Sequence, residues 1–270
     1  MGSSTAREDR VLVLAPRSTD TDRRLAVAAY RRGLRVERAR AWAVPEGVHA
    51  GRAHVYGGPL FADSVSRALA LALLEIPDDW LAGLPRDLTA RRVVATTLAQ
   101  ARRLRGSAFV KPPTDKTFPA RVYQDGSELP GPDRADPDKP VLVCEVVRFT
   151  AEFRLFVLDG EVCGASRYAV EGDLAVAPLA ACAEHREVAA FARDMCAATR
   201  DTLPSAAVVD VGRVDGRGWA VVEANAAWAS GSYACDDDAV LDVVLRAAGP
   251  LGETAGRDRR FLRPAPLVER

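Results

Sequence analysis

The sequence lacks several patterns that mark the commoner functional classes. Its 37 basic and 37 acidic residues cancel, so no excess of positive charge suggests nucleic acid or an anionic membrane as a partner. The five cysteines are scattered and never spaced as Cys-x-x-Cys, which disfavours a zinc site or a disulfide framework and favours reduced core thiols. The longest apolar run, at 68–74, is too short to cross a bilayer, and the polar first ten residues lack a signal core. We therefore expect a cytoplasmic protein.

Two further absences narrow the choice among nucleotide-binding folds. The chain has no Gly-x-Gly-x-x-Gly motif, and no internal repeat is visible. Its three histidines, His49, His54 and His185, form no cluster in the sequence, so we assign them no role.

The first hundred residues read as a small α/β domain. An aliphatic run over 10–16 predicts a strand, and the helical spacing over 20–33, which starts with acids and stops at Gly33, predicts a helix. Amphipathic spacing predicts further helices over 61–76 and 89–104. We place the end of this domain at residue 106.

The rest of the chain is richer in hairpins. Strand patterns with an intervening helix at 184–200 make residues 107–249 an α+β region. Residues 250–270, which are rich in Arg and Pro, predict an extended or loosely packed C-terminal arm.

One predicted hairpin, over 208–225, collects oxygen ligands. A turn at Gly216-Arg217 places Val214 opposite Trp219 and Asp210 opposite Glu223. Asn225 projects from the same face because side chains alternate along a strand. Two opposed carboxylates destabilise a sheet unless positive charge lies between them, so we expect a divalent ion there. A cluster of oxygen ligands alone suits Mg²⁺.

A second hairpin, over 151–170, has Asp159-Gly160 at its tip. Counting outward from that turn places Arg154 opposite Ala165 and Glu152 opposite Arg167, so the three charged residues share one face. A surface ladder of ion pairs and a phosphate-binding face fit this hairpin equally well. Lys111, at the end of an apolar strand, and Lys116 are further cations that could hold a phosphate.

Together these motifs resemble the ATP-grasp superfamily, and most closely a small divergent bacterial clade of it. The match covers roughly residues 85–248 and is carried by "FVKP", "CEVVRFTAEF", "EFRLFVLDG" with "SRY", and an acid followed thirteen residues on by Glu-x-Asn. The resemblance implies an α+β ATP-grasp fold preceded by an N-terminal α/β, Rossmann-like pre-ATP-grasp domain.

The resemblance also implies a role for each motif residue. The phosphates of ATP would be held by Lys111, by Arg91 (with Arg92 as the alternative) and by Lys116 in place of the family's long glycine-rich loop. Adenine would be read by Glu145, Val146 and Val147, and the ribose by Glu152. Arg154 and Arg167 would act on the phosphates or the transferred group, and Asp210, Glu223 and Asn225 would bind Mg²⁺.

The implied activity is an ATP- and Mg²⁺-dependent carboxylate–amine ligase that works through an acyl phosphate and releases ADP and phosphate. Its substrates would be small-molecule or peptide carboxylates and amines. Trp228, Ser230 and Tyr233 are candidate walls of the acceptor pocket, with ordinary loop packing as the alternative. Two other functions stay open: an ATP-dependent phosphotransferase acting on a small molecule or peptide, and a non-catalytic nucleotide-binding scaffold.

Overall fold

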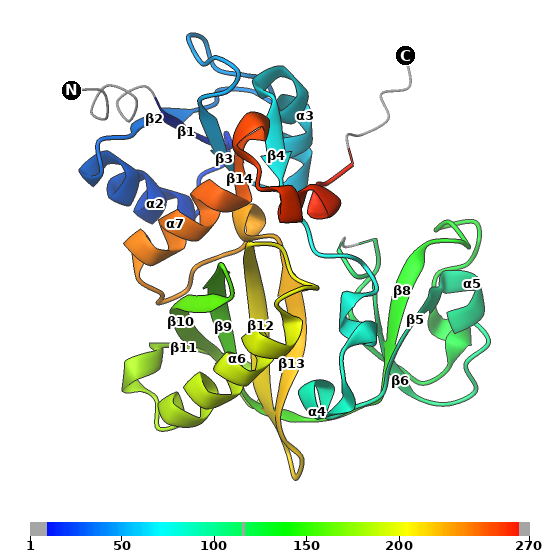
Figure 1. Cartoon of the computed structure of the whole chain (residues 1–270). Coiled ribbons are helices and arrows are strands. Elements are labelled where there is room, and N and C mark those ends of the chain that lie inside the picture. The colour runs from blue at the N-terminus through cyan, green and yellow to red at the C-terminus, as the bar shows by residue number, and fades with distance from the viewer. Residues whose placement is uncertain (1–9, 115–116, 265–270) are drawn as a thin grey trace.

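The computed structural model describes residues 10–114 and 117–264 and arranges them in three parts, each built on a β-sheet (Figure 1). An N-terminal part lies next to a large sheet, and a smaller sheet lies to the side of the large one. In the described part of the chain, no helix combines the length and the apolarity needed to cross a membrane.

The N-terminal part is a small parallel sheet with helices packed on it. Its strands run in the order β2 (Arg35–Arg38), β1 (Val11–Leu14), β3 (Ala53–Tyr56). Helix α2 (Asp20–Arg31) begins at a capping box formed by Thr19 and Asp22, and it ends just before Gly33. The predicted βα unit is therefore confirmed.

The C-terminal end of the chain completes this N-terminal part. Helix α7 (Asp237–Ala247) packs on α2, and β14 (Ala248–Pro250) pairs with β4 (Leu71–Leu73). The expected helix over 61–76 is shorter: α3 (Pro59–Leu69) ends where Ala70 adopts a left-handed conformation, and β4 follows.

The expectation of a loosely packed arm after residue 250 is wrong for its described part. Residues 251–253 and 256–261 form 3₁₀ turns, and Phe261 is buried. Asp258 is buried as well, and its carboxylate accepts hydrogen bonds from the backbone nitrogen and the hydroxyl of Ser205, at 2.8 and 2.6 Å.

The small sheet is antiparallel and includes a segment for which the sequence predicts a helix. Its order is β5 (Val93–Thr97), β8 (Pro140–Cys144), β6 (Ala108–Lys111), β7 (Arg121–Tyr123). The predicted helix over 89–104 is wrong, because only α5 (Leu98–Ala101) is helical after β5, whose Val and Thr residues suit a pleated strand. Since β5 pairs with β8, this sheet spans residue 106, and the expected domain boundary falls inside it.

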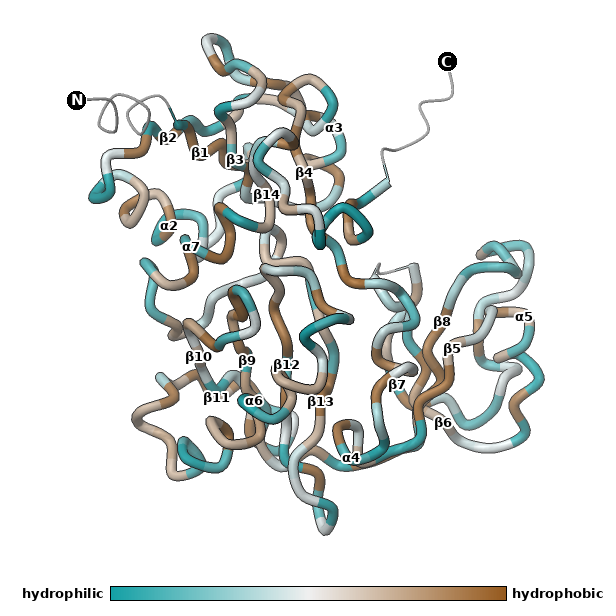
Figure 2. Tube along the Cα trace, in the orientation of Figure 1, coloured by the Kyte–Doolittle hydropathy of each residue, from teal (hydrophilic) through white to brown (hydrophobic). Residues whose placement is uncertain are grey.

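The large sheet carries the two predicted hairpins. Its order is β11 (Asp173–Pro178), β10 (Glu161–Val170), β9 (Phe149–Leu158), β12 (Ala206–Val214), β13 (Gly218–Asn225). Figure 2 shows that hydrophobic residues follow the strands, β12 among them. One face packs in an apolar cluster with α6 (His185–Thr199). On the other face Phe156 and Val208 join the core of the N-terminal part, while Arg154 and Asp210, two residues away from them along the same strands, are charged.

Candidate active site

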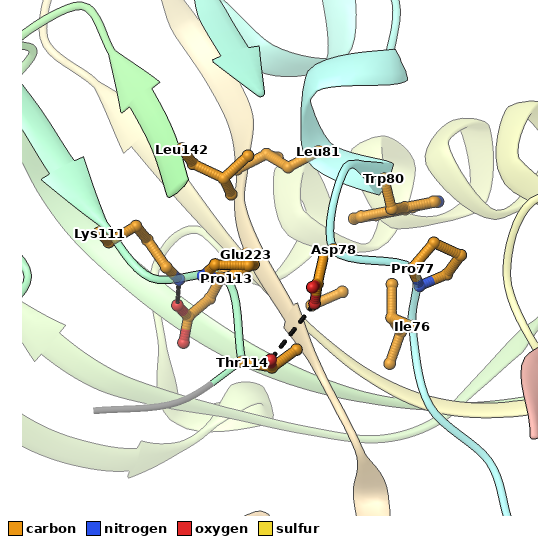
Figure 3. Close-up of a pocket in the computed structure, with 11 residues that line it drawn as sticks. Ile76, Pro77, Asp78, Trp80, Leu81, Lys111, Pro113, Thr114, Leu142 and Glu223 are labelled. Carbon is orange, nitrogen blue, oxygen red and sulfur yellow. Dashed lines mark hydrogen bonds and ion pairs between the residues drawn. The ribbon is translucent and has the colours of Figure 1, made fainter. Parts of the chain in front are cut away.

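A small pocket lies where the three parts of the chain meet (Figure 3). Lys111, from the end of β6, and Glu223, from β13, point toward each other and form an ion pair. On another side, the Thr114 hydroxyl donates to Asp78 at 3.2 Å. The pocket therefore joins the strand-end lysine to the hairpin that carries the expected metal ligands.

In that hairpin Asp210 pairs directly with Glu223, as the sequence predicts. The predicted turn is nevertheless wrong, because Val214 pairs with Gly218 and not with Trp219. The turn is one residue longer than expected, which by itself would shift the register by one position.

A β-bulge at Val222 restores the register. Val211 pairs with Val221 and Asp210 pairs with Glu223, so Val222 is the extra residue on β13. The longer turn and the bulge shift the pairing by one residue in opposite senses. The facing carboxylates survive for that reason, and the turn alone does not produce them.

Asp210 is neutralised by Arg154 on the adjacent strand β9. The Arg154 Nε donates to Asp210 Oδ1 at 2.9 Å, and Nη2 donates to Oδ2 at 2.7 Å. The Asp210 and Arg154 side chains are 2% and 11% exposed, respectively. Burial raises the pKa of Asp210 to about 6, and Arg154 limits this rise. The pair is thus a buried two-pronged ion pair that is ionised at neutral pH.

Glu223 has a cation of its own. Lys111 pairs with one Glu223 oxygen, and the Asn225 Nδ2 donates to the other at 2.8 Å. Burial acts to raise the pKa of Glu223, but Lys111, Asn225 and Arg154 together hold that pKa below its ordinary value. The expectation that a divalent ion must separate the two facing acids is therefore wrong, because Lys111 and Arg154 compensate them.

The β9–β10 hairpin has the predicted turn but not the predicted register. Leu158 pairs with Glu161 across Asp159-Gly160, as expected. Bulges at Cys163 and Tyr168 then add two residues to β10. The sequence pattern gives no sign of either bulge, and each shifts every later pair by one residue.

These bulges change which residues of β10 face Glu152 and Arg154. The predicted pairing of Arg167 with Glu152 is wrong: Arg167 pairs with Phe153, which packs on the α6 side, and its Nε donates to the Ala175 carbonyl at 2.9 Å. The structure thus separates Arg167 from the charged cluster, and the geometric ground for its catalytic role is lost.

Tyr168, which the sequence reasoning missed, takes this place. Its hydroxyl donates to Glu152 at 2.7 Å, and Arg154 Cζ lies 5.8 Å from the centre of its ring. Burial is the main cause that raises the pKa of Glu152. Tyr168 belongs to the "SRY" motif, but only the bulge turns its ring to this face.

The expected adenine-binding segment, residues 145–148, connects β8 to β9 without strand pairing. Glu145 accepts hydrogen bonds from Arg217 at 2.7 Å, from Arg86 at 3.0 Å and from the backbone nitrogen of Arg92 at 3.1 Å. The backbone bond from Arg92 is the main cause that lowers the pKa of Glu145. The adenine-binding roles of Glu145, Val146 and Val147 and the ribose-binding role of Glu152 stay predictions.

The remaining expected phosphate contacts differ from one another. Arg91 is buried and donates to backbone carbonyls, whereas Arg92 is exposed. Lys116 lies outside the described residues.

Of the three candidate acceptor-pocket residues, only Tyr233 joins the cluster. Its ring stacks on Tyr168 with centroids 5.2 Å apart, and Arg154 Cζ lies 5.0 Å from its centre. Trp228 instead is fully buried in the core of the N-terminal part, and its Nε1 donates to the Leu74 carbonyl at 2.8 Å. Ser230 is buried too and donates to a carbonyl of its own loop. The structure therefore assigns Trp228 and Ser230 to packing and does not place them on a pocket wall.

Comparison with known proteins agrees with this fold. Residues 88–243, more than half of the chain, match the family model of an ATP-grasp domain, and the chain therefore belongs to the ATP-grasp superfamily. Within that superfamily the matching model describes the second family of a single clade. The superfamily and the fold predicted from the sequence are confirmed. No curated protein matches the chain in sequence.

Several solved structures share the fold at low sequence identity. A RimK domain protein ATP-grasp from Sphaerobacter thermophilus is 16% identical, with a TM-score of 0.53, over 87% of this chain and 99% of that one. The D-alanine–D-alanine ligase from Bacillus anthracis is 13% identical, with a TM-score of 0.51, over 88% and 96% of the two chains. The ATP-grasp ligase PsnB complexed with minimal precursor is 15% identical, with a TM-score of 0.50, over 88% and 99%.

Proposed function

We propose that this protein is an ATP-dependent ligase that joins a carboxylate to an amine or a related nucleophile. The observation that carries the proposal is the charged cluster of the large sheet. There Lys111 and Arg154 lie beside Glu223 and Asp210, at the junction of the small and large sheets of an ATP-grasp fold. Cations that can hold a polyphosphate and acids that can hold its metal ion are thus within one site.

The residues present fit a magnesium ion. Within residues 10–114 and 117–264 no three His, Cys, Asp or Glu side chains form a ligand group, so the ion would depend on two carboxylates, one amide and the oxygens of the nucleotide. Because Asn225 turns its nitrogen toward Glu223, its amide oxygen is the atom left for a metal. Each Asp210 oxygen accepts one bond from Arg154 and keeps a second acceptor site.

Lys111 and Arg154 would stabilise the transferred phosphoryl group. Arg154 is fixed by Asp210 and lies near the rings of Tyr168 and Tyr233, so its guanidinium is oriented before substrate binds. Bound Mg²⁺ supplies charge neutralisation between the phosphates. Lys111 would release Glu223 and turn to the nucleotide.

The proposed reaction has two steps. A carboxylate oxygen of the acceptor takes the γ-phosphoryl group of ATP, which gives ADP and an acyl phosphate. The amine nitrogen then attacks the carbonyl carbon and loses a proton, the bond from carbon to the phosphate oxygen breaks, and phosphate leaves.

The acceptor would be a small-molecule or peptide carboxylate. The low-identity structures include both kinds of ligase by name, a D-alanine–D-alanine ligase and one complexed with a precursor, which supports this breadth and no finer choice. The five cysteines are free, which is compatible with a reducing compartment, and we propose the cytoplasm.

Trapping with hydroxylamine tests the reaction. Enzyme, Mg-ATP and a panel of carboxylic acids should form a hydroxamate together with ADP, because hydroxylamine intercepts an acyl phosphate. Release of ADP with no hydroxamate from any acid, and with a phosphorylated hydroxyl compound instead, would establish a phosphotransferase. Magnesium-dependent nucleotide binding without any turnover would favour the scaffold.

A further inference from the structure

The buried guanidinium of Arg91 binds the backbone of the hairpin that carries the metal ligands. Arg91 is 5% exposed. Its Nη1 donates to the Val221 carbonyl at 2.7 Å and to the Thr89 carbonyl at 3.1 Å, and its Nη2 donates to the Val222 carbonyl at 3.0 Å. The Cζ atom also lies 5.2 Å from the centre of the Phe149 ring. Two of its contacts therefore fall on the bulge and on the residue before it.

The bulge decides which face Glu223 occupies. Val221 pairs with Val211, and both pack in the apolar cluster beside α6. Without an extra residue at 222, strand alternation would turn Glu223 to that same apolar face, because a slip of one residue exchanges the two faces of a strand. With the bulge, Glu223 lies opposite Asp210, and Ala224 packs against the apolar cluster instead.

We infer that Arg91 is a positioning residue whose fork across the Val221 and Val222 carbonyls holds the bulge and thereby keeps Glu223 and Asn225 turned toward Asp210. The consequence for metal binding rests on the proposed function. Arg91 acts through the backbone, in contrast to the phosphate contact that the sequence suggested for it.

Substitution by lysine separates these two roles. A lysine keeps the positive charge that a phosphate contact needs, but it lacks the rigid fork that reaches two adjacent carbonyls. We define the magnesium enhancement as the ratio of ADP affinities measured by calorimetry with saturating Mg²⁺ and with EDTA. In Arg91→Lys this ratio should fall at least tenfold, while the exposed control Arg103→Lys should keep the wild-type ratio.

A double-variant cycle tests whether the effect passes through Glu223. Glu223→Gln should lower the magnesium enhancement, and Arg91→Lys combined with Glu223→Gln should lower it no further. Additive losses, or a wild-type ratio in Arg91→Lys, would overturn the positioning role. An unchanged ratio in Glu223→Gln alone would instead refute the magnesium site of the proposed function, so the two failures are distinguishable.

The wild-type protein provides a test that does not depend on folding of a variant. In a crystal structure with Mg²⁺ and ADP, the Arg91 guanidinium should still donate to the carbonyls of Val221 and Val222, with Val222 still bulged. A guanidinium that had moved onto a phosphate would overturn the inference.

Discussion

Lys111 has competing partners, and removal of Glu223 should expose that competition. Lys111 is 12% exposed and Glu223 is 30% exposed, so their ion pair is only partly accessible to solvent. A hydrogen bond to a charged group contributes about 1.5–3 kcal/mol. A nucleotide without metal must break this bond to use Lys111, whereas Mg²⁺ would occupy Glu223 and free the lysine.

Glu223→Gln should therefore bind ADP more tightly than wild type when Mg²⁺ is absent. At about 1.4 kcal/mol for each tenfold change in affinity, the gain is roughly 10- to 100-fold. The gain should disappear at saturating Mg²⁺, because the variant has lost a metal ligand.

Calorimetric titration of ADP in EDTA and in Mg²⁺ measures both effects. Glu161→Gln, an exposed residue at the far end of the β9–β10 hairpin, provides a charge-matched control that should behave as wild type. Equal affinities of wild type and Glu223→Gln in EDTA would refute the reasoning, since they would show that the ion pair does not hold Lys111 away from the nucleotide.

Three further predictions concern the buried polar groups. Asp210→Asn should lower the free energy of unfolding in urea by about 3 kcal/mol, because Arg154 stays buried without a counter-charge, and a loss below about 1 kcal/mol would contradict this. Burial lowers the pKa of His54, so below pH about 6.5 the unfolded chain binds the extra proton and stability should fall with pH, by up to about 1.4 kcal/mol per unit; His54→Gln should remove that slope in urea titrations. Trp228→Phe should cost about 1–3 kcal/mol by leaving the Leu74 carbonyl unpaired, with ADP affinity unchanged; a changed affinity at unchanged stability would return Trp228 to the acceptor pocket.

Several parts of the fold and site could be predicted because local rules decide them. The Asp159-Gly160 turn and the acids and Gly33 that bound α2 are set by neighbouring residues. The spacing of Asp210 and Glu223 identified two strands that face each other, and the structure pairs them.

The parts that failed depend on contacts between distant segments. The bulges at Tyr168 and Val222 decide which side chains reach the cluster, and the Val222 bulge is bound by Arg91, more than a hundred residues earlier in the chain. Strand β5 was mistaken for a helix because its partner, β8, lies about fifty residues away. Compensation of the facing acids by Lys111 and Arg154 was missed for the same reason: no local pattern shows which cation will pack beside which acid.

The central claim is that the charged cluster binds a magnesium nucleotide, and the most direct measurement is a crystal structure with Mg²⁺ and a non-hydrolysable ATP analogue. We predict that Lys111 will have left Glu223 for a phosphate oxygen and that the metal will be bound by Glu223 and the Asn225 amide oxygen. A nucleotide bound elsewhere, or an intact ion pair between Lys111 and Glu223 with no metal beside it, would contradict the account.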